Sequence, residues 1–124
     1  PIDGKSIVKL LKGTSDTSPH EAYFFYYGRQ LQAIRMGKWK LHFPHGYRTM
    51  AGRPGGTGGI PTGYSQAKIG LALFDMEKDI GETTDVKAKH PNIVKHLQAL
   101  GDKMRNELGD NGRTGTGTRP PGQL

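Results

Sequence analysis

The stretch from Leu73 to Val86 reads Leu-Phe-Asp-Met-Glu-Lys-Asp-Ile-Gly-Glu-Thr-Thr-Asp-Val. Leu71 and Leu73 have the spacing of a β-strand, which can pair with the aromatic strands upstream. The acidic turn that follows closes at Gly81. Beyond the turn, the chain enters a long amphipathic segment, and such a helix needs the face of a sheet to cover. We therefore expect this stretch to join a sheet to a helix.

Three further strands are expected upstream. Residues 22–27 form a dense aromatic run, Ala-Tyr-Phe-Phe-Tyr-Tyr, and consecutive apolar residues are typical of a strand covered on both faces. Residues 31–36 and 39–43 flank Gly37 and Lys38, which suit a type II′ hairpin turn because glycine takes the first central position. Together with the strand of the opening stretch, these segments predict a small antiparallel sheet of about four strands.

Residues 39–43 show the clearest alternation in the chain. Lys40 and His42 are expected on one face of this strand. The other face then carries three apolar side chains, those of Trp39, Leu41 and Phe43. This pattern predicts one face toward a core and one polar face.

Residues 91–108 predict a long helix. Pro91 suits the first helical turn, and Gly109 suits the residue that ends it. Gly101 costs about 1 kcal/mol relative to alanine inside a helix, which a close approach to the sheet would explain. Apolar side chains recur every three or four residues on one helical face, at Ile93, Leu97, Leu100, Met104 and Leu108. The predicted fold class is therefore α+β, a small antiparallel sheet packed against a long C-terminal helix.

The composition indicates one small domain that depends on a neighbour. The chain has 124 residues, of which 19 are glycine, and its hydrophobic fraction is only 33%. It contains no cysteine, which excludes disulfides and thiolate metal sites. No run of about 18 apolar residues occurs, so no membrane span is expected. The chain opens on Pro1 without an initiator Met, and we expect a processed chain or a piece of a longer polypeptide.

The formal net charge of +7 leaves two interpretations open. It suits a polyanion partner, such as a nucleic acid, a sulfated glycan or a membrane surface, and it equally suits a plain solvated surface. Acidic Asp102 and Glu107 accompany the basic residues of the predicted helix, which does not favour nucleic acid. No serine lies in a nucleophile elbow, so no Ser-His-Asp hydrolase is indicated.

Residues 45–64 predict a long, glycine-rich loop, and loops of this length are usually functional or disordered. Arg48 and Arg53 within it could hold an anion such as a sulfate group. His42 and His45 have a His-x-x-His spacing, but no further metal ligands accompany them. The acidic residues of the opening stretch depart from the calcium-loop pattern, with Val86 where the last ligand belongs. No metal site is predicted.

Five stretches, in this order, resemble the C-terminal domain of sulfatases of the arylsulfatase A type. The resemblance is carried by the phrase Leu-Phe-Asp-Met-Glu-Lys-Asp-Ile-Gly-Glu and by the hairpin Ala-Ile-Arg-Met-Gly-Lys-Trp-Lys-Leu-His-Phe. Ile80 and Asp85 depart from the family pattern, which usually has Pro and Asn there. The matching stretches are Asp3–Gly13, Phe24–Tyr27, Ala33–Phe43, Leu73–Glu82 and His90–Leu108.

The resemblance implies a non-catalytic part of a larger sulfuric ester hydrolase. The family's Cys/Ser-x-Pro-Ser-Arg signature, whose first residue becomes the formylglycine nucleophile, is absent from this chain. We therefore expect the isolated chain to be inactive, with calcium and formylglycine in the parent catalytic domain. Residues 1–19 would close that domain, 20–109 would form the C-terminal α+β domain, and 110–124 a Gly/Arg/Pro-rich extended tail. A periplasmic or secreted location is implied by the family alone.

Substrate contact is expected from the strand that ends at His42 and from the loop after it. The candidates are His42, His45, Tyr47 and Arg48, whose basic and aromatic character suits a sulfated sugar or aryl sulfate. The expected partners are the catalytic domain of the same polypeptide and a sulfated substrate. Self-association of the fragment through exposed apolar faces is a further expectation. The alternative function is a free-standing basic module that binds polyanions or sulfated glycans.

Overall fold

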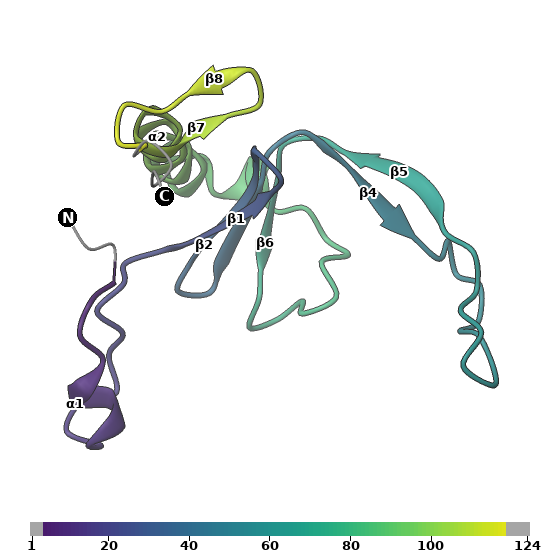
Figure 1. Cartoon of the computed structure of the whole chain (residues 1–124), viewed down its shortest axis with the longest axis horizontal. Helices are drawn as coiled ribbons and strands as arrows, with labels where there is room; N and C mark the ends of the chain where they lie inside the picture. The colour runs from purple at the N-terminus through teal and green to yellow at the C-terminus, as the bar shows by residue number, and fades with distance from the viewer. Residues whose placement is uncertain (1–3, 119–124) are drawn as a thin grey trace, which may run out of the picture.

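The computed structural model describes residues 4–118, which are organised around a four-stranded antiparallel sheet (Figure 1). The strands are β1 (Tyr23–Tyr27), β2 (Gln30–Met36), β3 (Trp39–His42) and β6 (Ala72–Asp75), in the spatial order β1-β2-β3-β6. The predicted type II′ turn between β2 and β3 is supported by the backbone. Its first central residue has a φ of +55°, which glycine accepts without strain, and the second does not have a positive φ.

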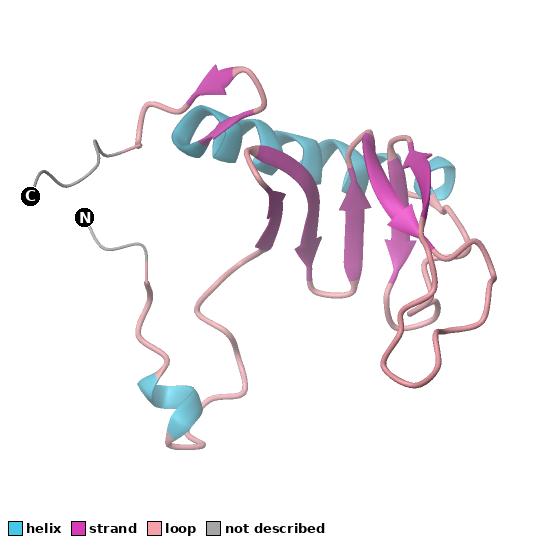
Figure 2. Cartoon of the chain, turned by 45° about the vertical axis from the view of Figure 1, so that its right-hand side comes forward, coloured by secondary structure: helices cyan, strands magenta, loops and turns pink. Residues whose placement is uncertain are grey.

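A long helix, α2 (Pro91–Leu108), follows a short 3-10 turn, η1 (Lys87–Lys89), and runs across one face of the sheet (Figure 2). It begins and ends at the predicted residues, so the α+β fold is confirmed. Leu97 of α2 is completely buried against the strands. The core consists of Leu31, Ile34, Leu41, Phe43, Leu73 and Leu97.

The opposite face of the sheet, here called the open face, carries Phe25, Lys40, His42 and Phe74. Sequence analysis expected β1 to be covered on both faces, and this is wrong for the described chain. No residue of β1 is fully buried, and Tyr23 is 65% exposed. Within residues 4–118, Tyr23 and Tyr27 therefore remain largely exposed, whereas Phe24 and Tyr26 pack against the core.

The turn after β6 returns to the outer edge of that strand. The Leu73 N–H donates to Asp85 Oδ1 at 3.0 Å, and the Val86 N–H donates to the Leu73 carbonyl at 2.8 Å. Within the turn, Asp79 Oδ2 accepts hydrogen bonds from the N–H groups of Thr83 (2.8 Å) and Thr84 (2.7 Å). These bonds lower the pKa of the Asp79 carboxyl. The predicted joint between sheet and helix is thus a closed, hydrogen-bonded turn.

The segment expected to be one long loop forms a second hairpin. Strands β4 (His45–Thr49) and β5 (Ser65–Ile69) pair antiparallel on either side of residues 50–64 and project away from the core (Figure 1). Neither strand contains a fully buried residue. We call this unit the β4–β5 arm.

Residues 110–118, expected to belong to an extended tail, fold back onto α2 together with Gly109. Strands β7 (Gly109–Asp110) and β8 (Arg113–Thr114) form a short hairpin. Asp110 Oδ1 accepts the Leu31 N–H at 3.1 Å, and Asp110 Oδ2 accepts Arg105 Nε–H at 2.6 Å. These long-range bonds order the segment. The rest of the expected tail, residues 119–124, lies outside the described residues.

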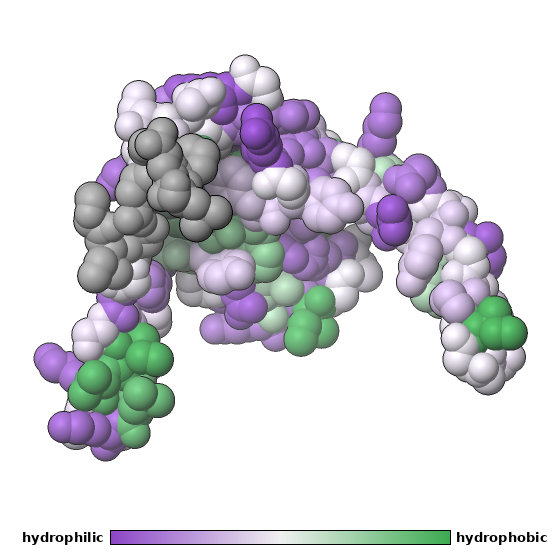
Figure 3. Space-filling view, viewed as in Figure 1, coloured by the Kyte–Doolittle hydropathy of each residue, from purple (hydrophilic) through white to green (hydrophobic). Residues whose placement is uncertain are grey.

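The N-terminal helix α1 (Val8–Leu11) stands apart from the core. Its N-cap residue is Ile7, and no side-chain hydrogen bond caps the helix among the described residues. Its apolar side chains form a patch at the end of one arm (Figure 3), and Leu11 is 76% exposed. Within residues 4–118, no helix is both long enough and apolar enough to cross a bilayer.

Gly101 allows α2 to approach the sheet closely. A Cβ at this position would lie 2.6 Å from Phe43 Cζ and 3.2 Å from Ile34 Cδ1. The Phe43 ring has little room to move, because it is buried and the Arg105 guanidinium lies 4.0 Å from its centroid. The glycine therefore reflects packing and not flexibility.

Gly101→Ala should lower the free energy of unfolding by about 1–3 kcal/mol through overpacking, although alanine is the better helix former. Urea unfolding of the polypeptide that carries this domain would measure the change. Gly70→Ala is the matched control, since a Cβ there meets nothing within 4 Å. A more stable Gly101→Ala protein would contradict this account of the packing.

Candidate functional site

Two polar side chains of β3 meet one carboxylate on the open face. Lys40 and His42 point to the same side of the strand, as predicted. Glu82, from the turn after β6, places Oε1 2.5 Å from Lys40 Nζ and Oε2 2.7 Å from His42 Nε2. The three side chains are only 17%, 12% and 24% exposed. This cluster was not foreseen from the sequence, where Glu82 belonged only to an acidic turn.

His42 is nearly enclosed. Both of its ring nitrogens are buried, and the contact with Glu82 lacks hydrogen-bond geometry, so neither nitrogen has a hydrogen-bond partner among the described residues. Burial is the main reason that the pKa of His42 is lowered; the Glu82 carboxylate opposes this shift and the Lys40 ammonium adds to it. The folded protein therefore favours the neutral imidazole.

His45 stacks on His42 at the base of the β4–β5 arm. The two ring centroids are 5.4 Å apart and the planes differ by 19°. Tyr47 continues the series, with its ring 6.4 Å from that of His45. His45 Nδ1 lies 2.7 Å from the Phe43 carbonyl, so Nδ1 carries the proton. In the neutral ring, Nε2 is then the acceptor, available to a hydroxyl or a protonated group.

Tyr47 and Arg48 line an open cavity of about 480 Å³ beside this series. Arg48 pairs with Gln66 across the arm, on the strand face opposite His45 and Tyr47. A guanidinium at such a cavity suits an anionic group. The remaining lining residues are Tyr27, Gln32, Gly46 and Gln66.

The four candidates therefore lie in one region and form two overlapping groups. His42, His45 and Tyr47 form a continuous series of rings, while Tyr47 and Arg48 line the cavity. Both ring nitrogens of His42 are buried, and Glu82 is the carboxylate beside it. The period-two pattern of residues 65–69, with Gln66 and Lys68 between apolar or small side chains, was the signal that could have revealed the second strand of the arm.

Four acidic side chains of residues 73–86 have separate partners. Asp75 pairs with Lys38 at 3.1 Å, and Asp79 caps the turn. Glu82 pairs with β3, and Asp85 accepts the N–H groups of Leu73 and Lys87. Within residues 4–118, no group of three or more His, Cys, Asp or Glu side chains could hold a metal ion.

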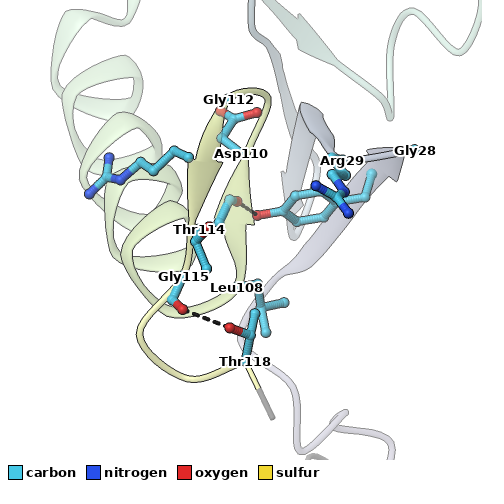
Figure 4. A pocket seen from close by; sticks show the side chains of 11 residues that line it. Gly28, Arg29, Leu108, Asp110, Gly112, Thr114, Gly115 and Thr118 are labelled. Atoms are coloured by element: carbon cyan, nitrogen blue, oxygen red, sulfur yellow. Dashed lines mark hydrogen bonds between the residues drawn. The ribbon is translucent and has the colours of Figure 1, made fainter. Parts of the chain in front are cut away.

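A larger cavity, of about 600 Å³, lies away from these candidates, between the β7–β8 hairpin and the β1–β2 turn (Figure 4). Tyr26 Oη–H donates to the Gly109 carbonyl at 3.0 Å, which ties the hairpin to β1. Arg29 and Arg113 are among its lining residues. None of the four predicted substrate residues reaches this cavity.

Comparison with known proteins decides the family. A family model described as the C-terminal region of aryl-sulfatase matches residues 18–117, which is most of the chain. The chain belongs to this family. The match covers the sheet, the β4–β5 arm and α2, so the candidate residues all lie inside the sulfatase C-terminal domain.

Curated relatives agree with this assignment. The chain is 36% identical over 122 residues to human arylsulfatase D and 28% identical over 120 residues to mouse steryl-sulfatase, with 86% of the chain covered in each case. An arylsulfatase from Hemicentrotus pulcherrimus is 50% identical over 42 residues, which cover 33% of the chain and 7% of that protein. The chain spans only about a fifth of the first two relatives, 20% and 19% of their lengths.

The enclosed His42 predicts that stability depends on pH. Because its pKa is lowered in the folded protein, the unfolded protein binds the proton at higher pH. Its contribution to the free energy of unfolding is fully present above the ordinary histidine pKa of about 6.5 and is lost as the pH falls below it. The melting temperature should therefore fall from about pH 7.5 to about pH 5.5.

This fall should be smaller in His42→Gln, measured by thermal unfolding of the parent polypeptide in matched buffers. His96→Gln is the control, because His96 on α2 is 52% exposed. The control should keep the slope of the unmodified protein. Identical slopes for all three proteins would contradict the buried neutral state of His42.

Proposed function

We propose that this sulfatase C-terminal domain supports the catalytic domain of its parent polypeptide and forms part of the wall of the pocket for a sulfated substrate. The parent would be a sulfuric ester hydrolase, with calcium and the formylglycine nucleophile in its catalytic domain. The contribution of this chain would be non-catalytic. Substrate contact would come from His42, His45, Tyr47 and Arg48.

The observation that carries the proposal is the β4–β5 arm. A two-stranded hairpin is marginally stable alone in water, and this one contains no fully buried residue in either strand. Its base nevertheless joins His45 and Tyr47 to the ring of His42, beside the cavity that Arg48 lines. An arm of this kind needs a second surface, and the larger part of a sulfatase would supply it.

The shape of the molecule supports a partner between its arms. Helix α1 and the tip of the β4–β5 arm extend to the same side of the molecule (Figures 1 and 2). Ile7, Val8 and Leu11 of the α1 region are exposed, as is Tyr23 of β1. Exposed apolar groups of this kind mark interaction surfaces.

The alternative of a free-standing polyanion-binding module has less support. Several cations are already engaged with carboxylates: Lys38 with Asp75, Lys40 with Glu82, and Arg105 with Asp110. These ion pairs add nothing to the net charge of +7, which is carried by other cations of the chain. The exposed apolar side chains of the α1 region also fit a protein partner better than a polyanion.

Substrate contact predicts a loss of affinity when the basic groups are removed. In the parent enzyme assayed on an aryl sulfate, Arg48→Ala and His45→Ala should each raise KM by about tenfold, the equivalent of one hydrogen bond to the substrate. The kcat should change less, because these groups bind substrate without joining the chemistry.

Lys68→Ala is the matched control for these variants. It removes one positive charge from the same arm and the same strand face as Arg48, but Lys68 does not line the cavity. Its KM should stay within about twofold of the unmodified enzyme. Unchanged KM values in both Arg48→Ala and His45→Ala would end the substrate-contact proposal.

If this domain supports the catalytic domain, removing an exposed apolar side chain of α1 should destabilise the parent polypeptide. Leu11→Ala in the parent polypeptide should lower its free energy of unfolding by about 2–4 kcal/mol, as for a buried leucine, although Leu11 is 76% exposed in this chain. Ile80→Ala, at a residue 86% exposed in the turn after β6, should cost at most about 0.5 kcal/mol. Equal, small effects in chemical unfolding would show that α1 does not dock.

A further inference from the structure

We propose that Glu82 is a positioning residue for the candidate substrate site: its carboxylate holds Lys40 and His42 on the open face, and through His42 it fixes the ring of His45. The inference rests on the proposed substrate role of His45. Glu82 itself lies in the turn after β6 and lines none of the cavities described above. It would act through its neighbours and not by touching the substrate.

The backbone at Glu82 is constrained. Its φ of +55° lies in the left-handed region, which costs a residue other than glycine about 1 kcal/mol or more. Asp79 holds the turn in this form, since its carbonyl accepts the Glu82 N–H at 3.1 Å and its carboxylate accepts the next two N–H groups. Such strain persists where surrounding bonds over-determine it. Here it delivers the Glu82 side chain to β3.

Each oxygen of the carboxylate serves a different side chain. Oε1 contacts Lys40 and Oε2 contacts His42. The Lys40 ammonium also lies 5.0 Å from the centroid of the Phe25 ring. A partly buried ammonium needs a counter-charge. Without Glu82, Lys40 would move toward water and His42 would lose its charged neighbour.

His42 passes this constraint to His45. Its ring meets Phe74 edge-on, with centroids 5.7 Å apart, and lies almost parallel to the ring of His45. His45 is held on its other side by the hydrogen bond from Nδ1 to the Phe43 carbonyl. The orientation of Nε2 of His45 therefore depends on the position of His42, and the position of His42 depends on Glu82.

Three titratable groups face His42 from the elements packed against it: Glu82 from the turn, Lys40 from β3 and His45 from β4. The neighbours at the same level on β2 and β6 are alanines, and Arg35 lies one pair further along. Among these groups Glu82 is the one anion. Its removal leaves the Lys40 ammonium near His42 without a counter-charge, which favours the neutral ring and lowers the pKa of His42 further.

The test is a histidine titration by nuclear magnetic resonance in the parent polypeptide with labelled imidazoles. In Glu82→Gln, the midpoint of His42 should fall and the ring signals of His45 should shift. Glu77→Gln is the matched control, because Glu77 lies in the same turn, carries the same charge and is 72% exposed. The His42 midpoint and the His45 ring signals should be unchanged in Glu77→Gln. The kcat/KM for an aryl sulfate should fall about tenfold or more in Glu82→Gln only.

The two proposals fail in different ways. Unchanged His42 and His45 signals in Glu82→Gln overturn the positioning role, whatever His45→Ala does to KM. An unchanged KM in His45→Ala overturns the substrate role of His45, even if the ring signals move in Glu82→Gln. If Glu82→Gln does not fold, Lys40→Met with Glu82→Gln removes both charges at once. A folded double variant with unmoved His45 signals would likewise overturn the positioning role.

Discussion

The hydrogen bonds at Leu73 are the constraint on which the rest of the structure depends. Its N–H and carbonyl are both engaged by the returning chain, at Asp85 and Val86. These bonds close the outer edge of β6, which would otherwise present unpaired groups. They also fix both ends of the intervening turn. The chain after Val86 is thereby aimed across one face of the sheet as η1 and α2, while Glu82 within the turn reaches the other face.

Elements specified by local patterns could be predicted, and those specified by distant contacts could not. The β2–β3 hairpin follows from Gly37 and the alternation around Leu41, and α2 follows from its apolar spacing. The β7–β8 hairpin has no such pattern. It is ordered by Asp110, which accepts hydrogen bonds from the backbone of Leu31, distant in the sequence, and from the side chain of Arg105 on α2. The β4–β5 arm pairs across residues 50–64, and its strands carry polar and small side chains, which left only a weak signal.

The candidate site shows the same division. The spacing of His42 and His45 was considered only for a metal site, and residue type suggested these two together with Tyr47 and Arg48 for substrate contact. The stack of the two rings depends on Pro44 carrying the chain from β3 directly into β4. Glu82 could not be assigned from its own surroundings, since five acids crowd this short stretch: Asp75 and Glu77 both lie near Lys38, and the other three have separate partners. Only the left-handed backbone at Glu82 and the register of β6 against β3 decide which acid meets Lys40.

The small core and the exposed arms are consequences of one arrangement. Most of the apolar side chains that fold this domain lie between α2 and a single sheet face, so the core alone buries few residues. Helix α1 and the β4–β5 arm then remain without cover, and both extend to the same side of the molecule. A partner bound on that side would bury the apolar patch of α1 and also stabilise the β4–β5 arm. Because the base of that arm carries His45 and Arg48, docking and the shape of the proposed substrate pocket would be set by the same contact.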